Sequence, residues 1–428
     1  MEKSKLLKFL KLGFVAAGIL VLFTLPRIIS SDGLDRWNSL AAVLGYGTPD
    51  TKKYSLIGPL FASPLVLLEQ WLKIPHRISM HYNLFLFLIL LVFLLKYLMQ
   101  IWSQQKATVF GIFLLFASMF PFHTLNFYSE IFTVLCLTFG SLFLVLNKSV
   151  AAFTFLTLAG ANTAATIPAI AALLLFHFYY ERKWRYLAAI TLPILLVLIE
   201  NKLHRGSFVT FGYEGDKGEK TFMPYSGLPG FSYPFFLGLL SILFSFGKGL
   251  LFFVPAFFLP LFFKPKYSNP KIERLGVYWF VISWLLIFTY SRWWSWHGSY
   301  WGPRFMLFTC LPASLLMTEA IYSRSLGWKA KLFVLYSLVI SFWATFEGLV
   351  FGHYDLGYCY RDSYQYESLC WYIPEFSALF RPLVSPRALK TKELVLALLW
   401  TITLLFIFLV WFKNENFIQT LRRRIRHK

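Results

Sequence analysis

Residues 80–101 read MHYNLFLFLILLVFLLKYLMQI, and this stretch decides the class of fold. The run is long enough to cross a bilayer as a helix, which takes roughly 17–25 apolar residues. Similar runs recur along the whole chain, whose mean hydropathy is +0.59. Only 14% of the residues are charged, whereas a soluble domain carries about a quarter. The sequence therefore predicts an all-α polytopic membrane protein, and the alternating strands of an outer-membrane barrel are absent.

The apolar runs predict a single transmembrane domain covering residues 1–428, with about twelve membrane-spanning helices. Two runs carry breaks: Phe246-Gly247-Lys248-Gly249 divides one of them into a short membrane-dipping helix and a full span. Thr166-Ile167-Pro168 marks either two short helices or one broken helix. The expected spans are 12–29, 80–101, 107–122, 127–147, 150–166, 167–181, 186–202, 234–264, 275–291, 304–322, 331–350 and 392–412.

Positive charge sets the expected orientation in the membrane. The chain carries a formal charge of +21, and Lys and Arg gather in alternate connections between the apolar runs. Because cytoplasmic loops are enriched in Lys and Arg, both termini are expected in the cytoplasm. The expected location of the protein is the inner (plasma) membrane. The charge then reflects topology and membrane lipids rather than nucleic-acid binding. The extracytoplasmic loops are expected to be 30–79, 203–233, 291–303 and 351–391.

Carboxylates mark the outer ends of two predicted helices. Residues 30–37 read SSDGLDRW, so Asp32 and Asp35 follow the first span directly, and Glu130 opens the span 127–147. Acidic residues at the edge of the hydrocarbon are costly unless they are paired or functional. We predict a catalytic role for all three, with helix capping as the alternative for Asp32 and Glu130. Downstream of Asp35, the broken apolar segment 54–73 predicts interfacial helices in the first loop.

A second polar cluster is expected around residues 291–304, which read SRWWSWHGSYWGPR. Arginine binds phosphate well, and aromatic faces can stack on a sugar or lie against a polyprenyl chain. Lys248 falls inside an apolar stretch, where an ammonium needs an anion or an aqueous cavity, with snorkelling to the interface as the alternative. The residues predicted to bind substrate are Lys248, Arg292, His297, Tyr300 and Arg304.

The four cysteines divide into two kinds. Cys136 and Cys310 lie inside predicted spans and are expected to be packing residues. Cys359 and Cys370 lie in the last outer loop, where an oxidising compartment favours a disulfide between them. The alternative is two free thiols.

Several short motifs together resemble the GT-C class of membrane glycosyltransferases, which includes protein O-mannosyltransferases and aminoarabinose transferases. They are the Asp32/Asp35 pair after the first helix, Tyr-Ser-Glu130, FGKGLLFFVP (246–255) and WHGSYWGPRFML (296–307). The last two are similar to segments of uncharacterised bacterial members. Two departures are visible: Gly33-Leu34 separates acidic residues that are adjacent in many members, and Thr166-Ile167-Pro168 stands where many carry Arg-Pro.

The resemblance implies an enzyme that moves a sugar from a polyprenyl-phosphate donor to a lipid, glycan or protein acceptor on the outer face of the membrane. An aspartate would act as general base, and the sugar would transfer with inversion. The implied reaction needs no metal ion or other cofactor in principle, and the sequence does not exclude a divalent cation. The sequence itself has no His/Cys metal pattern, phosphate-binding loop or dinucleotide fingerprint.

Three other functions fit the same composition. A lipid or glycan transporter (flippase) would place ionisable residues at mid-membrane, whereas the polar residues here gather at the expected outer face. A surface-glycan ligase or polymerase would use Arg and His from a large late loop, and the loop 351–391 contains Arg361, Arg381 and Arg387. An inactive scaffold on the same fold is the third alternative, since fold does not fix function.

Overall fold

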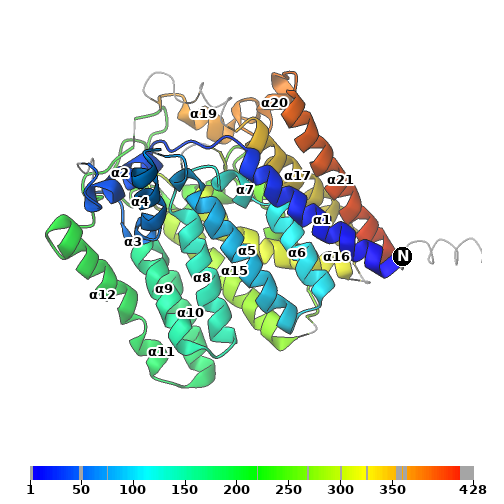
Figure 1. Ribbon diagram of the computed structural model, residues 1–428. Coiled ribbons are helices and arrows are strands. Elements are labelled where there is room, and N and C mark those ends of the chain that lie inside the picture. Colours follow the sequence, from blue (N-terminus) through cyan, green and yellow to red (C-terminus); the bar gives the residue numbers. More distant parts are fainter. Residues whose placement is uncertain are drawn as a thin grey trace, which may run out of the picture.

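The structure is a computed structural model that describes residues 3–47, 52–74, 76–218, 220–267, 269–298, 301–323, 326–352, 359 and 364–414. Within these residues it is built from helices and connecting turns, with one isolated β-bridge (Figure 1). The α-helices are α1 Lys3–Thr24, α2 Asp32–Val43, α3 Ile57–Leu60, α4 Ser63–Leu72, α5 Tyr82–Ile101, α6 Gln104–Phe116, α7 Phe120–His123, α8 Glu130–Val145, α9 Ser149–Asn162, α10 Ile167–Glu181, α11 Arg185–Ala188, α12 Thr191–Glu200, α13 Phe235–Phe244, α14 Leu250–Phe253, α15 Pro270–Tyr290, α16 Cys310–Tyr322, α17 Trp328–Val350, α19 Glu367–Tyr372, α20 Arg381–Val384 and α21 Thr391–Asn414.

Short 3₁₀ and π segments extend or connect these helices. The 3₁₀ segments are η1 Ser79–His81, η2 Ala164–Thr166, η4 Pro255–Leu261, η5 Arg304–Thr309 and η7 Pro374–Phe376, and η3 Asn201–Arg205 is a π-helix.

Seven helical segments of the described chain are long and apolar enough to cross a membrane, which agrees with a polytopic membrane protein. The other predicted spans correspond to shorter apolar stretches or broken helices, so the number twelve stays a prediction. The seven segments are Ser79–Ile101, Ala164–Glu181, Arg185–Arg205, Pro270–Tyr290, Arg304–Tyr322, Trp328–Val350 and Thr391–Phe412.

The predicted span 234–264 differs from expectation in its second half. The break at 246–249 is present, but only the four-residue α14 and the 3₁₀ segment η4 follow it, rather than one continuous helix. Pro255 and Pro260 account for this difference, because proline lacks the amide that an α-helix needs and its ring clashes with the preceding turn. At 166–168 the chain forms two helices, with Pro168 tolerated in the first turn of α10.

Helices α8 and α16 form the centre of the bundle. Every residue of α8 from Ile131 to Val145 is buried, although the helix is shorter than a typical span. The helices α5, α10, α12 and α21 instead leave apolar side chains exposed on one side, as expected for a surface that faces lipid.

The connections that precede α5 and follow α17 lie at the same end of the bundle. Helices α2 and α4 from the first long loop and α19 and α20 from the last one all lie there, together with α7 (Figure 1). Helices are thus present in the first loop, as predicted. Helix α4 leaves Leu67, Leu68, Trp71 and Leu72 exposed, which is the pattern of a helix that lies along an apolar surface.

Candidate functional site

The first turn of α2 places Asp32 against the segment that leads into α8. Asp32 is the first residue of α2, and the preceding Ser31 makes no side-chain cap to the helix. A Cβ at Gly33 would lie 3.3 Å from the backbone of Phe127. This close approach of two backbones brings the start of α2 to the start of α8, where Glu130 is the first residue.

Arg304 joins these two carboxylates. Its Nη2 forms an ion pair with Oδ2 of Asp32, and its Nε lies 3.4 Å from Oε1 of Glu130. The guanidinium also lies over the ring of Tyr128, 4.6 Å from its centroid. Arg304 is only 5% exposed, so this charge is neutralised within the protein rather than by solvent. Residues separated by 272 positions in the sequence thus form one charged cluster.

Arg304 keeps Asp32 ionised. Burial raises the pKa of Asp32, but attraction and a hydrogen bond to Arg304 outweigh it, and Arg36 and the hydroxyl of Tyr54 add to the effect. The result is a pKa well below the ordinary value of an aspartate. Asp32 is therefore a carboxylate throughout the physiological pH range, and in this arrangement its basicity is low.

Arg36 and Tyr54 form a second layer beside Asp32. The Arg36 guanidinium lies 4.3 Å from the centroid of the Tyr54 ring, and the nearby Tyr54 hydroxyl helps to lower the pKa of Asp32. The segment that carries Tyr54 is held from the other side, because the Leu56 amide and the Ser55 hydroxyl donate to Glu200 at 2.6 and 3.0 Å. An acid in a predicted membrane span thus positions part of the first loop.

Lys248 lies in the break between α13 and α14 and is almost completely buried. Its ammonium donates to the carbonyl oxygens of Gly298 and Gly302, at 2.9 and 3.2 Å. These two residues belong to the loop that leads to Arg304. Lys248 therefore contacts the backbone of the residues that precede Arg304.

His297 lies on the other side of the same loop. Its ring stacks on Trp371 of α19 with centroids 4.0 Å apart, and its Nδ1 lies 3.5 Å from Oε1 of Glu367. Burial and the neighbouring Lys248 lower the pKa of His297 well below its ordinary value. The imidazole is therefore neutral, and its contact with Glu367 is a polar contact and not an ion pair.

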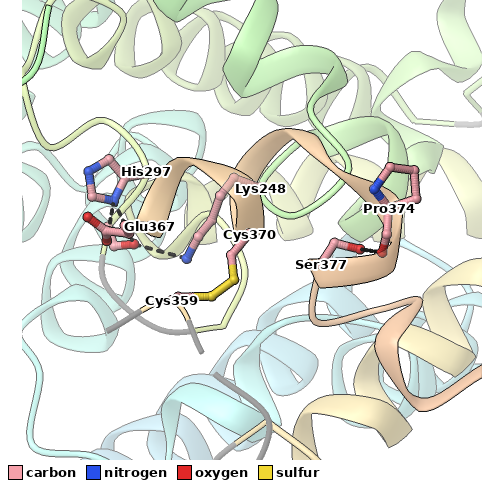
Figure 2. Close-up of a disulfide and its surroundings, with 8 residues drawn as sticks. Lys248, His297, Cys359, Glu367, Cys370, Pro374 and Ser377 are labelled. Atoms are coloured by element: carbon pink, nitrogen blue, oxygen red, sulfur yellow. Dashed lines mark hydrogen bonds and ion pairs between the residues drawn. A yellow bond between two sulfur atoms is a disulfide. The ribbon is translucent and has the colours of Figure 1, made fainter. Parts of the chain in front are cut away.

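The predicted disulfide between Cys359 and Cys370 is present, with the two Cα atoms 6.0 Å apart. It lies beside Glu367 and Lys248 (Figure 2). Cys136 and Cys310 are free and buried, in agreement with a packing role.

The structure brings some predicted site residues together and separates others. Asp32, Glu130 and Arg304 form one cluster, and Lys248 and His297 hold the loop next to it. Asp35 lies half-buried in the same first turn of α2 as Asp32. The Arg292 side chain is exposed, whereas Arg304 is buried. Tyr300 lies outside the described residues.

Sequence reasoning missed three residues near the cluster: Tyr54, Glu367 and His123. His123 is 2% exposed, and neither ring nitrogen has a hydrogen-bond partner among the described residues. Burial, followed by the charges of Arg304 and Lys248, lowers its pKa to about 3. The available signal was a histidine at the outer end of the predicted span 107–122. Glu367 also had a signal, since it lies one helical turn before Cys370.

Among the residues that the structure describes, no three His, Cys, Asp or Glu side chains are grouped closely enough to hold a metal ion. Comparison with protein-family models, with curated proteins and with solved structures finds no match to this chain. The site therefore has to be interpreted from its own chemistry.

Proposed function

We propose that this protein is a membrane glycosyltransferase of GT-C type, which transfers a sugar from a polyprenyl-phosphate donor to an acceptor hydroxyl at the outer face of the membrane. The observation that carries the proposal is the cluster of Asp32, Glu130 and Arg304. It combines a carboxylate that can accept a proton with a guanidinium that can hold a phosphate, at the end of the bundle where the long loops gather.

The proposed reaction is a single displacement at the anomeric carbon. The acceptor oxygen forms a bond to this carbon while its proton passes to the Asp32 carboxylate. The bond between the carbon and the phosphate oxygen breaks, and its electron pair leaves with the polyprenyl phosphate. The configuration of the sugar inverts. Cationic groups stabilise the charge that builds on the leaving phosphate, and Arg304 is the candidate for this role.

Arg304 has two tasks in this mechanism, and they are linked. A general base works best when its pKa is near the operating pH, whereas Arg304 outweighs the effect of burial and holds the pKa of Asp32 well below its ordinary value. A phosphate that attracts Arg304 would weaken its ion pair with Asp32. The proposal therefore includes an increase in the basicity of Asp32 when the donor binds. The buried Nη1 of Arg304, which has no hydrogen-bond partner among the described residues, is the atom that a phosphate oxygen could reach.

The exposed apolar side of α4 suits a lipid-linked substrate. Trp71 is 79% exposed and Leu67, Leu68 and Leu72 lie on the same short helix. We infer that α4 lies in the membrane interface, where an isoprenoid chain would approach the cluster from the lipid.

Substitution of Asp32 by Asn tests the proposal. The full-length protein in lipid vesicles is given a polyprenyl-phosphate sugar and an acceptor, and transfer is measured. Since a general base contributes roughly 10²–10⁴-fold to the rate, Asp32→Asn should lose transfer by that factor and still bind polyprenyl phosphate. Asp216→Asn is the matched control, because Asp216 is an outer-loop acid paired with Lys53 at 2.7 Å. Near-normal transfer by both Asp32→Asn and Asp35→Asn would rule out the mechanism.

A further inference from the structure

Two glycines that precede Arg304 have a constrained backbone. Gly298 and Gly302 have φ values of +55° and +66°, a region that residues with a side chain rarely adopt. A Cβ at Gly298 would lie 2.8 Å from Cγ of Arg304, and one at Gly302 would lie 3.3 Å from the ring of Phe253. The carbonyls of both glycines accept hydrogen bonds from Lys248. The position of Arg304 therefore depends on the Lys248 ammonium.

Helix α19 presents Glu367 to this lysine. Figure 2 shows Glu367 between His297 and Lys248, with the Cys359–Cys370 disulfide next to it. Glu367 and Cys370 are three residues apart on α19 and so lie on one side of the helix. The disulfide therefore fixes the helical face that carries the carboxylate.

The α19 backbone also docks directly on the segment that carries Lys248. The Gly247 amide donates to the Trp371 carbonyl at 3.0 Å. A Cβ at Gly247 would lie only 1.8 Å from the carbonyl oxygen of Cys370, so no larger residue fits there. Glu367 is therefore positioned by a covalent bond, a backbone hydrogen bond and the stacking of Trp371 on His297.

An ammonium buried to this extent needs an anion to stay charged. Burial has the largest effect on the pKa of Lys248 and lowers it, the charge of Glu367 raises it, and the charge of Arg304 lowers it. Among the described residues, the titratable groups that face Lys248 are Glu367 from α19, His297 and Arg304 from the neighbouring loop, and His123 from α7. Both histidines are neutral, and Arg304 repels the ammonium. Glu367 is thus the group in this set that favours the charged form of Lys248.

We propose that Glu367, held by the Cys359–Cys370 disulfide, is a positioning residue that keeps Lys248 charged and thereby fixes the loop that carries Arg304. The inference rests on the proposed function only for the role of Arg304 in transfer. The effect of Glu367 on the protonation of Lys248 can be measured without any activity assay.

The direct test measures the protonation of Lys248 in the full-length protein. Acetic anhydride modifies only the neutral amine, so the rate of Lys248 acetylation, followed by peptide mass spectrometry between about pH 5 and 9, gives its pKa. Because an opposite charge within about 4–6 Å shifts a pKa by roughly one to three units, Glu367→Gln should lower the midpoint by that amount. Reduction of wild-type protein with dithiothreitol should shift the midpoint in the same direction.

Glu375→Gln is the matched control, because Glu375 is an exposed glutamate on the same segment. In this variant the acetylation midpoint of Lys248 should equal that of wild type. Should Glu367→Gln fail to fold, the reduced wild-type protein provides the comparison. An unchanged Lys248 midpoint in Glu367→Gln, or in the reduced protein if the variant does not fold, would overturn the proposal.

Transfer provides a second measurement that separates the two proposals. In Glu367→Gln, transfer should be lost at a lower pH than in wild type, by the same shift as the acetylation midpoint, and should recover on acidification. A shifted midpoint with an unshifted transfer profile would overturn the link from Lys248 to Arg304. A shifted midpoint in a chain that transfers no sugar would support the role of Glu367 and count against the glycosyltransferase.

Discussion

At the scale of single residues, Arg304 makes contacts that only a guanidinium can make at once. Nη2 and Nε reach different carboxylates, and the planar face lies over Tyr128. The sequence indicates that Arg304, Asp32 and Glu130 are polar residues at the ends of predicted helices. It does not indicate that they meet, because the ion pair joins residues 272 positions apart and depends on the packing of three separate elements.

Replacing Arg304 by Lys preserves the charge and removes the fork, so one of the two carboxylates loses its partner. Removing one partner of a buried pair costs about 3–5 kcal/mol, and since lysine keeps the charge and Asp32 is partly exposed, we expect a loss of about 1–3 kcal/mol. Thermal unfolding in detergent measures it as a lowered Tm, accompanied by weaker binding of polyprenyl phosphate. Arg77→Lys, at an exposed arginine of the first outer loop, should leave both values unchanged. A wild-type Tm in Arg304→Lys would contradict the role assigned to the fork.

The ionisation of Asp32 predicts a pH dependence with a definite sign. The folded protein holds the pKa of Asp32 below its ordinary value, whereas the unfolded chain has a pKa of about 3.9. The ionised form therefore stabilises the fold above about pH 4, and this contribution is lost as the pH falls through the folded pKa. The Tm difference between wild type and Asp32→Asn should be constant from about pH 5 to 7 and should shrink below about pH 4. A difference that grows on acidification would contradict the ion pair.

At the scale of elements, sequence periodicity and hydropathy locate most helices but not the contacts that orient them. The first loop shows this limit. The apolar segment 54–73 indicates interfacial helices, and α3 and α4 are present. Their orientation depends on Glu69, which is completely buried and accepts hydrogen bonds from the amides of Ile78 and Ser79 and from the Ser79 hydroxyl. The sequence does not indicate that this glutamate accepts hydrogen bonds from the amides at the start of the segment Ser79–Ile101.

Glu69→Ala should therefore loosen the start of the segment Ser79–Ile101. The buried Ser79 amide and the partly buried Ile78 amide would lose their acceptor, and an unsatisfied buried group costs about 1–3 kcal/mol. The Ser79 hydroxyl accepts from the Trp37 indole at 2.9 Å and would lose the acceptor of its own proton. We expect a lower Tm and faster hydrogen exchange at residues 76–82. Gln70→Ala, at the neighbouring half-buried position, is the control, and equal Tm values for the two variants would contradict the capping role.

At the scale of the whole molecule, hydropathy predicts a helical membrane protein and cannot fix the number of spans. Helix α8 is as apolar as a lipid-facing helix, yet it is buried among other helices over nearly its whole length. A helix that is covered by its neighbours does not have to be long enough to cross the whole membrane. The segment 250–261 fails as a span for a local reason, its two prolines. Residue-level patterns therefore predict the polar end of the bundle better than they predict the span count.

The disulfide connects topology to chemistry, because Cys359 and Cys370 pair stably only in an oxidising compartment. If loop 351–391 is extracytoplasmic, protein that is alkylated on lysis and denatured without reductant should show two reactive thiols, from Cys136 and Cys310, and four after reduction. Reporter fusions at residues 45 and 375 should both report the outer side. The bridge closes a short loop and should stabilise the fold by about 2–4 kcal/mol, so reduction should lower the Tm. Four thiols before reduction, or a cytoplasmic signal at residue 375, would place α19 and Glu367 on the wrong side of the membrane for the proposed reaction.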